Sequence, residues 1–252
     1  MRALLHQLRF EQLIFWRNRE AAFFTFFLPV IFFVLFGAIY GNDVIKSEHV
    51  KGSSFLEAGM IGYGVASTAF AGLAITLTIR RESGVLKRIR STPLAPSAYL
   101  ASALASTFLV FLIEATIIIA LGRLLYGVRV PERLFSLILA LVLGAASFAA
   151  LGVGLTSLVR SAEGSSAVVN AVYLPMAIIS GTFFSPHAYP GFLRAIADVL
   201  PLTYFTRLSR AIMLHGQEIW SQPGSVAAIA IWGAIGLAAA LRWFRWEPRE
   251  SY

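Results

Sequence analysis

Residues 21–40 read AAFFTFFLPVIFFVLFGAIY, twenty positions without a single charged side chain. A helix needs about 20 apolar residues to cross the hydrocarbon core of a bilayer. The strands of a membrane β-barrel alternate apolar and polar residues over about ten positions, whereas this stretch is apolar on every face. It therefore predicts a transmembrane α-helix.

Five further stretches of this kind follow along the chain. Only 13% of the 252 residues are charged, against about 25% in a soluble domain, and the charges gather in short blocks. Between the blocks lie six uncharged runs of at least 22 residues, too apolar for the helices of a soluble protein. We expect an all-α integral membrane protein, forming one membrane domain over residues 1–252. The expected spans are residues 21–40, 56–79, 98–122, 134–158, 165–184 and 225–241.

The segment before the first span combines leucines and aromatic residues with four arginines. Its main apolar residues occupy about a third of a helical wheel. This pattern predicts an amphipathic helix over residues 1–20 that lies in the membrane interface. A flexible, positively charged leader is the alternative. The apolar residues concerned are Leu4, Leu5, Leu8, Phe15 and Trp16.

The loop before the last span, residues 185–224, is long and rich in apolar residues. Phe192, Ile196 and Leu200 recur at helical spacing, and Pro201 ends that helix. We expect short re-entrant or interfacial helices in this loop.

The basic residues indicate an orientation. With both termini in the cytoplasm, 13 lysines and arginines face inward and 8 face outward, which agrees with the positive-inside rule. The expected location is the bacterial plasma membrane, as a multi-pass protein with both termini cytoplasmic. The dispersed basic residues do not form a surface for nucleic acid.

Several chemistries are not expected. The chain contains no cysteine and no G-x-x-x-x-G-K-[ST] phosphate loop, so we expect no ATP hydrolysis by this chain alone. Its four histidines lie far apart, without the spacing of a metal site. We therefore predict that it is not an enzyme on its own, with no catalytic residue, no metal site and no cofactor.

One charged loop interrupts the apolar runs. Residues 80–96 read RRESGVLKRIRSTPLAP, with an apolar stripe of Val85, Leu86 and Ile89 beside a basic flank. Pro93 and Pro96 stop this short helix. A loop at 80–97 that only joined two spans would need neither stripe nor stop, so we interpret it as a docking element for another protein. The alternative is a positive cluster that only sets the topology.

This loop and a second segment carry a family resemblance. The loop is similar to the pattern R-E-x-G-x-L-x-x-L-x-x-T-P-L of the ABC-2 type transporter permeases, of the daunorubicin-resistance kind. Residues 170–204, NAVYLPMAIISGTFFSPHAYPGFLRAIADVLPLTY, resemble the family's segment at the fifth span and beyond. The chain departs from the family where a Pro-Gly pair is common near the start of the second span, since it has Glu57-Ala58-Gly59 there.

The resemblance implies a permease subunit driven by two copies of a separate ABC ATP-binding subunit, which would hold ATP and magnesium. A second permease subunit, identical or paralogous, would form a dimer with it among the membrane lipids. The implied function is export of an amphipathic drug or lipid-like molecule, as in multidrug efflux and antibiotic resistance. A polysaccharide-exporter permease is the alternative, and a membrane-embedded lipid-modifying enzyme a remote one. The implied coupling residues are Arg81, Glu82, Gly84, Val85, Leu86, Lys87, Arg88, Ile89, Thr92 and Pro93.

Three residues are candidates for the path of the cargo. Glu114 is the one acidic residue clearly inside an expected span, and ionisable groups there tend to mark pathways or interhelical pairs. A purely structural hydrogen bond or ion pair is the alternative for it. Phe26 and Phe33 belong to an adaptable aromatic surface of the first span, although such phenylalanines can equally face lipid.

Overall fold

The computed structural model describes residues 2–45 and 49–248. Six helical segments in this part of the chain are long and apolar enough to cross a membrane. The prediction of an all-α membrane protein with six transmembrane helices is therefore confirmed. The six segments are α2 (Arg19–Tyr40), Gly52–Glu82, α6 (Pro96–Tyr126), α7 (Leu134–Leu155), α8 (Ala162–Ile179) and α11 (Pro223–Trp243).

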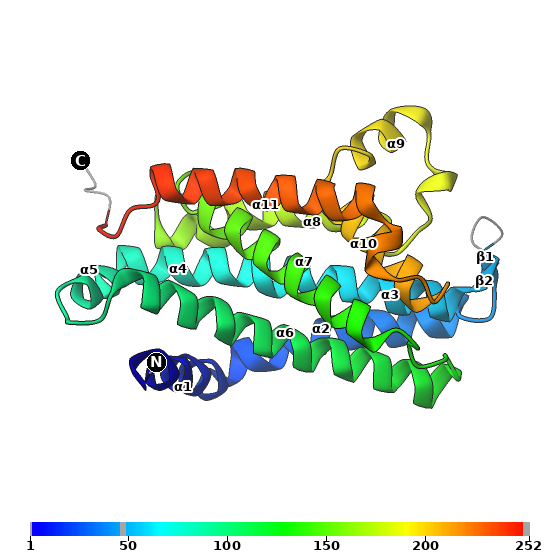
Figure 1. Ribbon diagram of the computed structural model, residues 1–252, viewed down its shortest axis with the longest axis horizontal. Helices are drawn as coiled ribbons and strands as arrows, with labels where there is room; N and C mark the ends of the chain where they lie inside the picture. The colour runs from blue at the N-terminus through cyan, green and yellow to red at the C-terminus, as the bar shows by residue number, and fades with distance from the viewer. Residues whose placement is uncertain (1, 46–48, 249–252) are drawn as a thin grey trace.

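The spans run side by side along the long axis of the molecule (Figure 1). The short helix α5 (Val85–Arg90), the first helix α1 (Arg2–Arg17) and the end of α11 lie at one end, which we call the α5 end. The opposite end carries the small hairpin of β1 (Val44–Ile45) and β2 (Val50–Lys51), and we call it the hairpin end. Both ends of the chain therefore approach the same side of the bundle.

The second span is longer than expected. It comprises α3 (Gly52–Gly64), the π-helical segment η1 (Val65–Gly72) and α4 (Leu73–Glu82), and so exceeds the expected 56–79 at both ends. The fifth span begins at Ala162 and ends at Ile179, five residues before the expected end. Its early end has a local cause, because Gly181 has φ +79°, a left-handed conformation that terminates helices.

This second span lies at the centre of the bundle. Ala58 and Ala66 are completely buried, and a Cβ on Gly62 would lie 2.5 Å from the methyl carbon of Thr206. Small residues let helix backbones approach closely in lipid, which is the packing that their spacing predicts. Because the neighbours belong to the same chain, these small residues do not provide a seam for a second copy.

The pair α7 and α11 is packed still more closely. A Cβ on Gly236 of α11 would lie 2.5 Å from the backbone nitrogen of Leu151 in α7. No side chain fits between the two backbones at this point. The close approach of α7 and α11 therefore requires glycine at position 236.

The first helix α1 is ordered and attached to the bundle. In Figure 1 it is seen nearly end on, and so runs across the direction of the spans. Trp16 of α1 is about half exposed, and its ring stacks on Phe26 of α2 at 5.6 Å between centroids. A flexible leader is thus the wrong interpretation of this segment, and an amphipathic helix is the right one.

The loop before the last span contains the expected short helices. They are η2 (Pro186–Ala188), α9 (Gly191–Ala197), α10 (Pro201–Met213) and η3 (Ile219–Ser221). Most of α10 is buried inside the bundle. Arg210 donates a hydrogen bond to the carbonyl of Gly181, and its guanidinium lies 3.7 Å from the ring centre of Phe55. Arg210 is one of the eight basic residues that were expected to face outward. It instead connects α10 to α3 inside the bundle.

Candidate coupling surface and intramembrane polar cluster

The loop between the second and third spans is a compact, closed turn. Gly84 has φ +73° with open space where a Cβ would lie, so glycine serves the backbone conformation here. After α5, the Thr92 hydroxyl donates to the carbonyl of Ile89 at 2.7 Å and accepts from the amide of Leu94 at 3.3 Å. Pro93 lies in this turn, and Pro96 occupies the first turn of α6. The chain thus reverses direction within a dozen residues.

The apolar stripe of this loop is divided between the inside and the outside. Leu86 is completely buried in the chain's own core, and Ile89 is half-buried against it. The stripe does not face outward as a whole, because Leu86 anchors α5 to the bundle. The exposed surface is formed by Val85, Lys87, Arg88, Arg90, Thr92 and Pro93, and we call it the α5 face.

Arg81 lies inside the bundle and not on the α5 face. Its side chain is 1% exposed and donates to the carbonyls of Thr156 and Val159 at 2.8 and 2.7 Å. These carbonyls follow the end of α7, where helical backbone oxygens lack partners within the helix. Arg81 also pairs with Glu82 at 2.7 Å, which is largely buried. This pair ties the stem of the loop to α7.

The neighbouring Arg80 reaches in another direction. Its guanidinium bonds the two carboxylate oxygens of Glu11 in α1 at 3.0 and 2.8 Å, and donates to the hydroxyl of Tyr99 in α6 at 2.7 Å. Gln12 adds two hydrogen bonds of 2.9 Å to the carbonyl and hydroxyl of Ser106. Two adjacent arginines therefore connect one loop to α1, α6 and the end of α7. The sequence interpretation did not identify Glu11 and Arg80, since both resembled ordinary interfacial charges.

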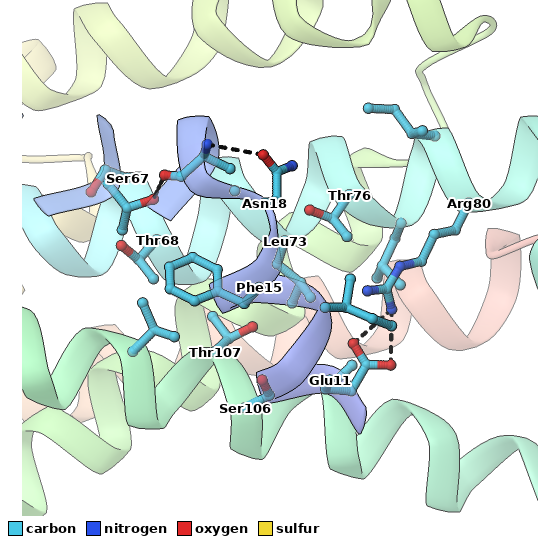
Figure 2. A pocket seen from close by; sticks show the side chains of 18 residues that line it. Glu11, Phe15, Asn18, Ser67, Thr68, Leu73, Thr76, Arg80, Ser106 and Thr107 are labelled. Carbon is cyan, nitrogen blue, oxygen red and sulfur yellow. Dashed lines mark hydrogen bonds and ion pairs between the residues drawn. The ribbon is translucent and has the colours of Figure 1, made fainter. Parts of the chain in front are cut away.

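A cavity of about 330 Å³ opens beside this junction. It lies between α1, α2, the second span and α6, and Figure 2 shows the ion pair of Glu11 and Arg80 at one side of it and Ser67 and Thr68 at the other. Apolar side chains such as Phe15 and Leu73 complete the wall. The cavity thus combines an apolar surface with hydrogen-bonding groups. Its hydroxyls belong to Thr25, Ser67, Thr68, Thr76, Ser106 and Thr107.

Glu114 lies behind the wall of this cavity. It is 2% exposed, and its Oε2 accepts a hydrogen bond of 2.8 Å from the hydroxyl of Thr68. Its Oε1 has no hydrogen-bond partner among the described residues and packs at Gly64, where a Cβ would lie 2.8 Å away. Thr68 belongs to the π-helical segment η1, and such segments are frequent at functional sites. Thr68 therefore lines the cavity and also donates a hydrogen bond to the buried carboxylate of Glu114.

The two phenylalanines are not part of this cluster. Phe26 packs on Phe15 and Trp16 of α1, whereas Phe33 is completely buried and meets the ring of Tyr126 edge-on at 5.5 Å. Neither lines the cavity. The structure thus places Glu114 behind the cavity wall, bonded to Thr68, and leaves Phe26 and Phe33 in helix packing.

A second buried carboxylate was overlooked in the sequence. Glu57 is 2% exposed and belongs to α3. It stands at the second position of the expected span 56–79 and bounds an uncharged run, so it was interpreted as a charge at the edge of that span. The early start of the second span at Gly52 places it inside the helix.

Comparison with known proteins agrees with this architecture. The family model described as "ABC-2 type transporter" matches residues 3–214. The chain belongs to this family. The match spans all elements from α1 to the end of α10, so the resemblance that rested on two motifs extends over most of the bundle.

Three relatives of known description are permeases. The chain is 27% identical over 221 residues to the daunorubicin resistance ABC transporter permease protein DrrB1 of Streptomyces coeruleorubidus, covering 85% of this chain and 75% of the relative. It is 23% identical over 205 residues to the putative transport permease YvfS of Bacillus subtilis, covering 81% and 82%. The inner membrane transport permease YhhJ of Escherichia coli is 26% identical over 179 residues, covering 68% and 47%. The chain is therefore a membrane transport permease of the ABC-2 family.

Proposed function

We propose that this permease is the membrane subunit of an ATP-driven exporter, with the α5 end in the cytoplasm. The orientation follows the bias of basic residues toward that end. The observation that carries the proposal is the α5 face, a basic surface held in place by the buried Arg81 and the partly buried Arg80. A separate ATP-binding subunit would dock there and would supply ATP and magnesium.

The contacts of the loop explain how a movement of the ATP-binding subunit could be transmitted to the transmembrane helices. A force on the α5 face acts on the stem at Arg80 and Arg81, which are bonded to α1 and to the end of α7. Because packed cores shift between discrete arrangements and do not deform continuously, the loop, α1 and α7 would move together. We expect two ATP-binding subunits and a second permease, identical or paralogous, in the complete exporter.

The cavity supports an amphipathic cargo. Its apolar wall would hold a hydrocarbon or aromatic body, and its hydroxyls would bind the polar part. Its position beside α1 places it at the depth of the cytoplasmic leaflet in the proposed orientation. A drug-like or lipid-like molecule of mixed polarity fits this lining, and the bacterial plasma membrane is the expected location.

Copurification tests the proposal. The tagged permease is expressed in the cells that naturally produce it, solubilised gently, and compared with a Lys87→Glu/Arg88→Glu variant, which reverses two charges on the α5 face. An Arg123→Glu/Arg129→Glu variant is the matched control, because it makes the same charge change at the hairpin end. We expect the ATPase to accompany the native chain and the control, and to be lost from the first variant. Equal recovery with all three would contradict docking at the α5 face.

A further inference from the structure

A polar cavity of about 490 Å³ lies at the hairpin end, remote from the α5 face. Its lining comes from β2, the start of α3, the loop after α6 and the loop after α10. Glu57 belongs to its wall, together with the neighbouring Ser54. In the proposed orientation this cavity faces the outside of the cell.

Among the described residues, the buried carboxylate of Glu57 has no ion-pair partner. Its residue is 2% exposed, and none of the described basic side chains forms an ion pair with it. The carboxylate packs against Gly122 of α6, where a Cβ would lie 2.7 Å from Oε1. Only a glycine on α6 leaves room for the carboxylate at this place. Burial of an ionised carboxylate is costly unless a donor or a cation satisfies it.

The mouth of the cavity contains charges of both signs that do not neutralise Glu57. Lys51, Arg129 and Glu132 line the cavity and are exposed to solvent. Without an ionised Glu57, these three leave a net positive mouth. An ionised Glu57 brings the sum of these four charges to zero, so its state decides whether the cavity carries a net positive charge.

We propose that this cavity is an outward-facing binding site for a primary ammonium group, with Glu57 as its counterion. An ammonium ion brings three donors to a carboxylate that forms no ion pair with any described residue. A metal ion fits less well, because no group of three or more His, Asp and Glu side chains suitable for a metal occurs in residues 2–45 and 49–248. Ser54 stands three residues before Glu57, on the same face of the helix, where its hydroxyl can accept a further hydrogen bond from the ligand.

The absence of cysteine from the sequence allows a direct test of this site. A single Ser54→Cys variant is treated in right-side-out vesicles with 2-aminoethyl methanethiosulfonate, a cation, and with the 2-sulfonatoethyl reagent, an anion of similar size. Rates are divided by those measured with a free thiol in solution. Ethylammonium chloride is then added as a competitor, with sodium chloride at equal ionic strength as its control.

We expect the cationic reagent to react faster by about tenfold, because Ser54 lies one helical turn from Glu57, whereas the exposed Lys51 and Arg129 are screened by salt. Ethylammonium should slow the reaction, whereas sodium chloride at equal strength should not. In a Ser54→Cys/Glu57→Gln variant both effects should vanish. A Ser54→Cys/Glu114→Gln variant is the matched control and should behave like Ser54→Cys alone.

Several outcomes would overturn the proposal. A faster reaction of the anionic reagent would mean that Glu57 is protonated and that Lys51 and Arg129 determine the field. Failure of ethylammonium to protect would exclude the site even if the Glu57→Gln variant did not fold. Labelling from the cytoplasmic side only would also refute it, because the cavity would not face outward. The labelling needs neither ATP nor the partner subunit, so its result is independent of the copurification experiment.

Discussion

Arg81 donates a hydrogen bond of 2.8 Å to the backbone carbonyl of Thr156, seventy-five residues further along the chain. This bond connects the stem of the loop at the end of the second span to the end of α7. It is fully buried, and a charged donor makes it stronger than a hydrogen bond between neutral groups. The relation between these two residues gives the permease a fixed link between the loop that carries α5 and its helix bundle.

Removal of this link should weaken both stability and coupling. In an Arg81→Ala variant the carbonyls of Thr156 and Val159 lose a charged donor, with an expected loss of about 3 kcal/mol in the free energy of unfolding. The exposed Arg88→Ala is the control and should change stability by less than about 0.5 kcal/mol. Thermal unfolding in detergent measures both variants. An unchanged melting temperature for Arg81→Ala would show that the link does not contribute to stability.

The ion pair of Glu11 and Arg80 should hold α1 against the bundle. A Glu11→Gln variant weakens bonds of 2.8 and 3.0 Å to a charged donor, with an expected loss of about 2 kcal/mol. Released from the bundle, α1 should be cleaved faster by trypsin at Arg17 or Arg19. The doubly exchanged variant Glu11→Arg/Arg80→Glu should recover part of the protection. Equal cleavage of native and Glu11→Gln proteins would contradict this role.

The role of Glu114 can be separated from that of its partner. A Glu114→Gln change keeps the size of the side chain and its bond with Thr68, so the fold should persist while transport of a cargo that approaches through the cavity should fall. A Thr68→Val change leaves both carboxylate oxygens without a donor and should destabilise the fold by about 1–3 kcal/mol. Efflux of the amphipathic dye ethidium, measured beside thermal unfolding, distinguishes these effects. Full efflux with Glu114→Gln would exclude Glu114 from the path and leave it a structural role.

The close contact of α7 and α11 predicts opposite effects for two glycines of the same helix. Ala at position 236 would place its methyl group against the backbone of Leu151, and overpacking of this kind costs about 2 kcal/mol. Gly224, near the start of α11, has open space where a Cβ would lie. Gly224→Ala should be neutral or should stabilise by up to about 1 kcal/mol. Equal unfolding temperatures of the two variants would contradict the close packing of the two backbones.

The course of the chain through the membrane could be predicted because lipid imposes a simple condition. Backbone groups within the hydrocarbon core must be bonded within the chain, so an uncharged run such as residues 21–40 has few alternatives to a helix. The same criterion misjudged the start of the second span, because the uncharged run begins only after Glu57, whereas the helix begins at Gly52. Counting charges along the sequence does not distinguish a charge that is buried within a span from a charge at the end of that span.

The loop at residues 80–97 was predictable as an element, but the orientation of its short helix was not. The stop at Pro93 and the basic flank are visible in the sequence. Which side of a six-residue helix faces inward depends on the left-handed turn at Gly84, and this turn directs Leu86 into the core. The inward direction of Arg81 depends on the distant carbonyls of Thr156 and Val159, for which no local pattern exists.

Photo-crosslinking at the α5 face tests the central claim most directly. A photoreactive benzoylphenylalanine is introduced at Arg88, or at Arg129 of the hairpin end as the control, and the products formed in cells are identified by mass spectrometry. We predict a crosslink from position 88 to an ATP-binding subunit and none from position 129. The absence of that subunit from the products at position 88, or its equal presence at both positions, would contradict the assignment of the α5 face as the coupling surface.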